Sequence, residues 1–301
     1  NPQNVTFEQY AERYGETYVA IKSSETYRVY KSMLQRCMPL YPRRMCDITR
    51  TDLQQIVNAS WNHPSMARLL CNRLYGIWQS AVIDGIVQQN IAVKLNRPKE
   101  IPAQKRPLTQ EEIEAIKKAD LTEMERLLVD ILYQFGLRPA EAFAIDTHSV
   151  NSATKMLLID QSVSSRNSVP YIKTTKTGVS RSLPIPENLL PRLIPAQGNK
   201  YLFTAENGGL CSPNDIKRMA RHIKQKINIA MGGTDSVWVT DISLYTFRHN
   251  KATSLYYMQG NVSLKAKANY MGHSEQTFIR TYSHLVDEKE SVELLRLPTS
   301  Q

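Results

Sequence analysis

Residues 271–284 read MGHSEQTFIRTYSH, and this stretch near the end of the chain decides how the rest of the sequence is interpreted. A Gly-His pair opens it, and Tyr282 stands near its end. The apolar spacing predicts a helix over residues 275–284, with Tyr282 half-buried on its apolar face. The apolar neighbours of Tyr282 at helical spacing are Phe278, Ile279, Leu285 and Val286. A chemical role for Tyr282 would require cationic and imidazole groups from elsewhere in the chain beside its hydroxyl.

The charge of the chain is strongly and evenly positive. Lys and Arg total 38 against 28 Asp and Glu, which gives a net charge of +10 and a pI near 9.4. Residues 1–100 and residues 101–301 each carry a net charge of +5, so the excess is not confined to a tail. A basic surface spread over the whole chain fits a long polyanion better than a point contact. A solvated basic protein without such a partner has the same composition, and charge alone does not separate the two.

The cysteine and histidine patterns argue against disulfide scaffolds and metal sites. Cys37, Cys46, Cys71 and Cys211 form no CxxC pair, which predicts free thiols in a reducing compartment. The histidines lack the paired spacing of a zinc site, so we expect no metal and no cofactor. The sequence has no apolar run of 18 residues and no signal pattern, which predicts a cytoplasmic protein without membrane association. Because the chain begins at Asn1 without a methionine, we expect a further segment upstream of it.

Residues 1–97 are predicted to form a small helical domain. Capping boxes mark helix starts at Thr6 with Gln9 and at Thr51 with Gln54. Helical patterns follow over residues 25–38, 52–59 and 65–84. The last of these leaves several polar side chains outside its apolar face: Arg68, Asn72, Arg73 and Gln79. These residues could face a duplex, although ordinary solvated residues would have the same pattern.

Residues 98–107, PKEIPAQKRP, are rich in proline and basic residues, which predicts an extended linker. Residues 108–301 then form a second domain. Capping boxes at Thr109 with Glu112 and at Thr122 with Glu125 open two helices, and Gly136 is predicted to end the second. Strands are predicted over residues 155–163 and 168–186. Within the second of these, a hairpin would turn at residues 177–178. Helices are predicted to start at Ser212-Pro213 and to cover residues 244–259, 263–270 and 275–284.

Three short motifs occur in a fixed order in this second domain. They are GLRPAE at residues 136–141, LYTFRHNKAT at residues 244–253, and MGHS at residues 271–274 followed by Tyr282. With the lysine-bearing stretch TTKTGVSRS between the first two, this series resembles the catalytic domain of the tyrosine recombinases, the phage integrase family. The preceding helical domain resembles the core-binding domain of that family. The resemblance implies a mainly α fold, with an α+β catalytic domain that carries a small antiparallel sheet.

The resemblance also assigns roles to individual residues. Tyr282 would attack the scissile phosphorus and form a 3′-phosphotyrosyl link, while Arg138 and Arg248 would hold the non-bridging oxygens with paired donors. His273 would donate to the phosphate or assist with the tyrosine proton. A hairpin lysine would protonate the leaving 5′-oxygen. Lys176 aligns best with that role, and Lys173, three residues earlier, is its competitor.

One position departs from the pattern of the family, whose second motif commonly reads His-x-x-Arg. Here Tyr245 stands three residues before Arg248. A phenol can donate a hydrogen bond to a phosphate but cannot carry the charge of an imidazole. The role of the family's imidazole is therefore expected to fall to His273. His249 could buttress the site or could be a packing residue. Glu141 is expected to orient Arg138 or its helix rather than to take part in the chemistry. His284 is expected either to support the catalytic residues from behind or to be merely exposed.

The function that follows from the resemblance is site-specific cleavage and rejoining of DNA by a phage or mobile-element integrase. The two domains would clamp duplex DNA, and several protomers, from a dimer to a tetramer, would assemble on paired sites. Accessory DNA-bending proteins are possible partners, and an arm-binding domain could precede Asn1. Two alternatives remain open: relaxation of DNA in the manner of a type IB topoisomerase, and a non-catalytic DNA-binding protein on the same fold.

Overall fold

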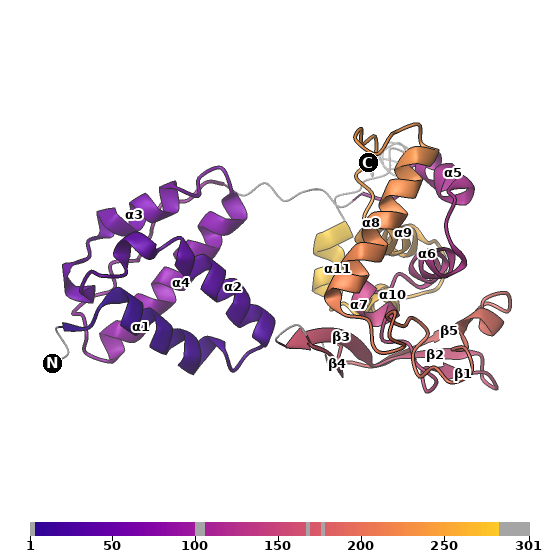
Figure 1. Cartoon of the computed structure of the whole chain (residues 1–301), viewed down its shortest axis with the longest axis horizontal. Helices are drawn as coiled ribbons and strands as arrows, with labels where there is room; N and C mark the ends of the chain where they lie inside the picture. Colours follow the sequence, from indigo (N-terminus) through magenta and orange to yellow (C-terminus); the bar gives the residue numbers. More distant parts are fainter. Residues whose placement is uncertain (1–3, 100–105, 167–168, 176–177, 283–301) are drawn as a thin grey trace, which may run out of the picture. The chain divides into compact units, whose positions relative to one another are not determined.

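The computed structural model describes residues 4–99, 106–166, 169–175 and 178–282. The chain divides into two compact units, Asn1–Ala103 and Gln104–Gln301 (Figure 1). None of the helices in the described residues is both long and apolar enough to cross a membrane.

The first unit is a bundle of helices around one apolar core. Its elements are α1 (Phe7–Tyr14), which continues as a π-helical turn (Gly15–Val19), α2 (Ser24–Gln35), α3 (Arg50–Asn58) and α4 (Pro64–Ile83), with short 3-10 turns at Met38–Leu40 and Met45–Asp47. Phe7 of α1 stacks on Trp78 of α4, with 5.5 Å between the ring centres, and both side chains are buried. This contact joins the first and last helices of the bundle.

The helix starts of the first unit follow capping chemistry, with one correction. The predicted box of Thr6 and Gln9 is confirmed. The box predicted at Thr51 and Gln54 is wrong, because Thr49 caps α3 and pairs reciprocally with Asp52. A threonine with a polar residue three positions later also occurs two residues earlier, and the helix begins there.

The described part of the second unit contains seven helices beside small sheets. They are α5 (Gln110–Lys118), α6 (Glu123–Phe135), α7 (Pro139–Ala142), α8 (Pro213–Ala230), α9 (Leu244–Tyr257), α10 (Leu264–Met271) and α11 (Glu275–Tyr282), with a 3-10 turn at Leu190–Leu193. The predicted capping boxes at Thr109 and Thr122 are confirmed. Helices α6 and α9 pack together in the interior, and Phe135 and Phe247 are among the fully buried side chains there.

The strands form two separate antiparallel sheets. They are β1 (Val150–Asn151), β2 (Met156–Ile159), β3 (Gln161–Arg166), β4 (Val169–Thr174) and β5 (Arg181–Pro184). The order is β1-β2-β5 in one sheet and β3-β4 in the other, and in Figure 1 the strands lie together along one side of the second unit. The predicted strand over residues 155–163 is therefore two strands.

The predicted hairpin within residues 168–186 is wrong. The chain does turn, since Gly178 has a φ of +69° and its N–H donates to the Thr175 carbonyl at 2.9 Å. The flanking strands, however, pair elsewhere: β4 with β3, and β5 with β2. In β5, Leu183 lies opposite Leu157 of β2, and both are buried, so the apolar partner of β5 is in β2 rather than in β4.

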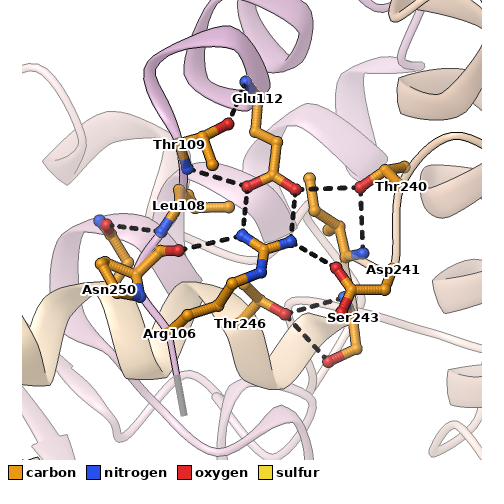
Figure 2. Close-up of polar contacts among 11 residues, drawn as sticks. Arg106, Leu108, Thr109, Glu112, Thr240, Asp241, Ser243, Thr246 and Asn250 are labelled. Atoms are coloured by element: carbon orange, nitrogen blue, oxygen red, sulfur yellow. Dashed lines mark hydrogen bonds and ion pairs between the residues drawn. The ribbon is translucent and has the colours of Figure 1, made fainter. Parts of the chain in front are cut away.

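A buried carboxylate fixes the point where the chain enters the second unit (Figure 2). Glu112 receives two hydrogen bonds from the Arg106 guanidinium, each 2.7 Å, and further ones from the Thr109 N–H and the Thr240 hydroxyl. Arg106 also pairs with Asp241. Burial raises the pKa of Glu112, but the hydrogen bonds from Arg106, Thr109 and Thr240 outweigh burial, so its pKa is lowered overall.

The same entry segment is fixed to helix α9. The Leu108 N–H donates to the side-chain oxygen of Asn250 at 3.2 Å (Figure 2). Residues 106–112 are thereby tied both to the segment before α9 and to α9 itself, the helix that carries the second sequence motif.

Two helices end at glycines with left-handed backbones. Gly136 ends α6 with a φ of +64°, as predicted, and Gly272 ends α10 with a φ of +63°. A methyl group on Gly136 would lie 2.9 Å from the Lys251 side chain, and one on Gly272 would lie 2.9 Å from Nη1 of Arg181. Both positions therefore need glycine for backbone conformation and for space.

We expect Glu112→Gln to destabilise the second unit by about 1.5–3 kcal/mol, because charge-assisted hydrogen bonds to a buried carboxylate are lost. The midpoint of urea unfolding measures the change. Glu114→Gln is the matched control, since Glu114 lies on the same helix and forms an exposed pair with Lys117, and it should change stability by less than about 0.5 kcal/mol. Equal effects of the two variants would show that the buried network does not hold the entry segment.

We expect Gly272→Ala to cost more stability than Gly208→Ala. Both glycines have positive φ, so each alanine meets left-handed strain of about 1–2 kcal/mol. No other atom lies within 4 Å of a methyl group on Gly208, whereas one on Gly272 meets the Arg181 guanidinium. The difference between the two unfolding free energies measures that close approach, and a difference near zero would contradict it.

Candidate active site

The first and third sequence motifs meet at the C-terminal ends of two helices. Helix α6 ends at Gly136, and Arg138 follows two residues later; helix α10 ends at Gly272, and His273 follows directly. In each case the left-handed glycine turns the chain out of the helix, so that the next polar side chain leaves at the helix end. Two helix C-termini are thereby placed beside one another. The last carbonyl groups of each helix have no hydrogen-bond partner within that helix.

Arg248 of α9 lies between these two helix ends and holds them together. Its side chain is buried, with 3% exposed. Nη1 donates to the Gly136 carbonyl at 2.7 Å, and Nη2 donates to the Met271 carbonyl. Burial, and then the neighbouring Arg138, lower the pKa of Arg248 to about 10, so the guanidinium is charged at neutral pH. The negative ends of the two helix dipoles favour that charge.

One buried carboxylate organises two further arginines. Glu141 accepts from Arg138 Nη1 at 2.6 Å through one oxygen and from Arg181 Nη2 at 2.7 Å through the other. Arg138 Nη2 also donates to the Gly272 carbonyl at 3.2 Å. Burial raises the pKa of Glu141, but Arg181 and Arg138 outweigh burial and lower it overall. Glu141 orients Arg138, as the sequence predicted, and also holds an arginine that the sequence analysis did not single out.

His273 is a neutral imidazole with a defined hydrogen-bond role. Burial, together with the charges of Arg248 and Arg138, lowers the pKa of His273 to about 3. Its Nε2 lies 2.9 Å from Nη2 of Arg248, which can only donate, so Nε2 is the acceptor and the ring proton is assigned to Nδ1. Within the described chain this buried Nδ1 has no hydrogen-bond partner. It is a donor available to an acceptor that enters the site.

Tyr282 ends helix α11 and is fully buried, with 0% exposed. Its hydroxyl lies 3.1 Å from Nδ1 of His249, and its ring lies beside those of Phe278 and His273. Burial raises the pKa of Tyr282, while Arg248 and Arg138 act to lower it. The structure therefore brings together four of the predicted residues: Arg138, Arg248, His273 and Tyr282.

The other predicted residues are exposed or half-buried, or they lie outside the described residues. Tyr245, in the first turn of α9, is 51% exposed, and Lys173 is exposed on β4. Lys176 and His284 are outside the described residues. In the first unit, Arg68 and Asn72 are exposed on α4 and Arg73 is half-buried. The roles predicted for these residues stay predictions.

Arg181 is the site residue that sequence reasoning missed. It lies in the quoted stretch TTKTGVSRS, at the start of β5, and its side chain is 8% exposed. Its Nε and Nη1 are buried and have no partner among the described residues. A signal was present: Arg181, Leu183 and Ile185 alternate along the chain, and the two apolar residues are buried, so the arginine points toward the same side as the core.

The cluster carries more positive charge than its carboxylate can balance. The cluster holds three guanidinium groups, those of Arg138, Arg181 and Arg248, and one carboxylate, that of Glu141, which pairs with Arg138 and Arg181. The adjacent His273 adds an unused donor. Such an arrangement suits a bound anion with several acceptor oxygens. Across the described residues, no group of three or more His, Cys, Asp or Glu side chains is arranged to hold a metal ion.

Solved structures with a similar fold are integrases. The Tn1549 transposon integrase, in complex with a circular intermediate DNA, superposes with a TM-score of 0.75, covers 96% of this chain and 98% of its own, and is 17% identical. A λ integrase dimer bound to a core site superposes with a TM-score of 0.68, covers 91% and 97%, and is also 17% identical. The fold is therefore that of the integrases, mostly helical with small antiparallel sheets.

Curated relatives are tyrosine recombinases. XerC of Alcanivorax borkumensis is 25% identical over 67% of this chain and 63% of its own length. XerD of Corynebacterium glutamicum is 27% identical over 58% and 53%, respectively. The chain thus spans between one half and two thirds of the length of these relatives. The profile of the phage integrase family matches residues 106–289, which is more than half of the chain, and the chain belongs to that family.

Proposed function

We propose that this chain is a site-specific recombinase that cuts and rejoins DNA strands through a covalent 3′-phosphotyrosine intermediate. The observation that carries the proposal is the position of Tyr282 beside a cluster of three arginines with one carboxylate. Breaking a phosphodiester without a metal requires a nucleophile and neutralisation of the charge that develops on the phosphate. The cluster supplies both kinds of group, and its excess positive charge and unused donors suit a phosphate.

In the proposed reaction, the Tyr282 oxygen attacks the scissile phosphorus and the bond to the 5′-oxygen breaks. Arg138 and Arg248 offer donors to the non-bridging oxygens, and Nδ1 of His273 offers another. Lys176 protonates the departing 5′-oxygen, with Lys173 as the alternative. The covalent link retains the energy of the ester, so the strand can be rejoined by a 5′-hydroxyl without ATP.

The proposed substrate is duplex DNA that carries recombination sites. In support, the similar integrase structures contain DNA, and λ integrase has been solved as a dimer on a core site and as a tetramer on a Holliday junction. We propose the same kind of assembly for this chain. Residues 1–97 would bind DNA through α4, which carries Arg68, Asn72 and Arg73, residues 98–107 would link the domains, and residues 108–301 would hold the catalytic site. Accessory DNA-bending proteins and a cytoplasmic location remain predictions.

The two alternatives share the fold but differ from the proposal in chemistry. Relaxation of DNA would use the same residues without paired sites, and a non-catalytic protein would bind DNA without a covalent link. The buried, partner-bearing Tyr282 gives no support to a non-catalytic protein, and the similar integrases favour recombination over relaxation.

We expect wild-type protein to form a denaturation-resistant adduct with a nicked suicide duplex taken from the end of the element that encodes the chain. Tyr282→Phe should abolish the adduct, because the nucleophilic oxygen is lost. Tyr133→Phe is the matched control, since Tyr133 is an exposed tyrosine of α6 in the same unit with no predicted role, and its adduct should persist. If wild-type protein binds the duplex in a gel-shift assay and forms no adduct, the recombinase proposal is wrong.

We expect Lys176→Ala to slow cleavage by about 100-fold or more, because the leaving oxygen loses its proton donor. A 5′-bridging phosphorothiolate, whose sulfur leaves without a proton, should restore the rate. Lys173→Ala is the comparison. If the phosphorothiolate rescues Lys173→Ala and not Lys176→Ala, the general acid is Lys173.

A further inference from the structure

The nucleophile of the proposed reaction must lose a proton in a place that water does not reach. The Tyr282 side chain is 0% exposed, and burial raises its pKa, so the phenol does not ionise by itself near neutral pH. A neighbouring group has to accept the proton as the oxygen attacks. The structure limits which group that is.

His273 is poorly suited to accept it. Its Nε2 lone pair receives a hydrogen bond from Arg248, and its Nδ1 carries the ring proton. A pKa lowered to about 3 means that a second proton on this ring is strongly disfavoured. His273 is arranged as a hydrogen-bond donor to an anion, which is a different task.

Tyr245 is no better placed for this role. Its side chain is half-exposed in the first turn of α9, and a phenol is not a base at neutral pH. The arginines of the cluster are donors without a lone pair, and Glu141 already receives hydrogen bonds from two of them.

His249 has the geometry of a proton acceptor. It follows Arg248 on α9, and its Nδ1 lies 3.1 Å from the Tyr282 hydroxyl, within the range of a catalytic hydrogen bond. The two rings are inclined by 51° with centres 6.1 Å apart, so they meet through the ring nitrogen and the hydroxyl rather than by stacking. An imidazole with Nδ1 unprotonated accepts a hydrogen bond from the phenol in this position.

We propose that His249 is the general base that takes the proton of Tyr282 during cleavage; this inference rests on the proposed recombinase function. The phenolic O–H bond breaks, its proton moves to Nδ1 of His249, and the oxygen forms the bond to phosphorus while the bond to the 5′-oxygen breaks. As that bond breaks, the 5′-oxygen takes a proton from the general acid of the proposed reaction. In rejoining, the 5′-hydroxyl gives this proton back as its oxygen attacks phosphorus, the bond from the tyrosine oxygen to phosphorus breaks, and His249 returns the phenol proton to the tyrosine oxygen. No additional reactant is consumed in either direction.

The test replaces the base and keeps its hydrogen bond. In His249→Asn the amide oxygen can occupy the place of Nδ1, accept a hydrogen bond and take no proton. Single-turnover cleavage of the suicide duplex should slow by about 100-fold or more, the usual contribution of a general base. His148→Asn is the matched control, because His148 is 84% exposed and lies outside the cluster, and it should cleave at the wild-type rate.

A more acidic nucleophile separates proton transfer from packing. A tyrosine with several ring fluorines at position 282 has a much more acidic phenol than tyrosine itself, so its attack depends less on a base. With this nucleophile, the ratio of the wild-type rate to the His249→Asn rate should fall from about 100 to below about 10. A ratio that is the same with both nucleophiles would overturn the inference, because a packing role does not depend on phenol acidity.

Gel-shift binding of the duplex is measured in parallel for each variant. His249→Gln, which carries the same amide on a longer side chain, replaces His249→Asn if that variant does not bind the duplex. Failure of the inference is distinct from failure of the proposed function. Absence of any adduct with wild-type protein refutes the function, whereas adduct formation at an unchanged rate in the His249 variant refutes only the base.

Discussion

The second unit depends on the way in which one arginine joins two helix ends. Arg248 donates to the last carbonyls of α6 and α10, and its charge is favoured by two helix dipoles rather than by a carboxylate of its own. Arg138 and His273, which follow those helix ends, are brought to the site by the same contacts. Because the structural partners of Arg248 are neutral, its positive charge remains available to an anion. One side chain therefore assembles the site and supplies part of its electrostatics.

Two of the buried carboxylates of the second unit, Glu112 and Glu141, show the contrast between a hydrogen-bond network that is complete and one that is not. Glu112 is matched by Arg106, Thr109 and Thr240, with polar groups on all sides satisfied. Around Glu141, by contrast, buried donors of Arg181 and His273 lack partners in the described chain. Buried donors without partners are costly unless a ligand satisfies them. The network around Glu112 stabilises the fold. The network around Glu141 has donors left over for a bound ligand with acceptor oxygens.

Local chemistry was readable from the sequence, and long-range pairing was not. The helix starts at Thr109 and Thr122 and the glycine end at Gly136 follow from contacts within four residues, and these predictions are confirmed. The hairpin was wrong, since alternation shows which face of β5 is buried but not that its partner is β2. Motif order identified Arg138, Arg248, His273 and Tyr282, whereas the buried place of Arg181 depends on that same strand pairing.

The complete burial of Tyr282 has a consequence for which DNA sequences would be cleaved. A hydroxyl that water cannot reach is equally out of reach of a phosphodiester that is merely nearby. Under the proposed function, a duplex must first rearrange the side chains around this tyrosine, and the free energy for that step comes from binding along the whole site. A poorly matched duplex that binds weakly would leave the tyrosine covered. Under the proposed function, DNA sequences would thus be distinguished by whether their binding supplies enough free energy to uncover Tyr282, before any bond in the DNA is broken.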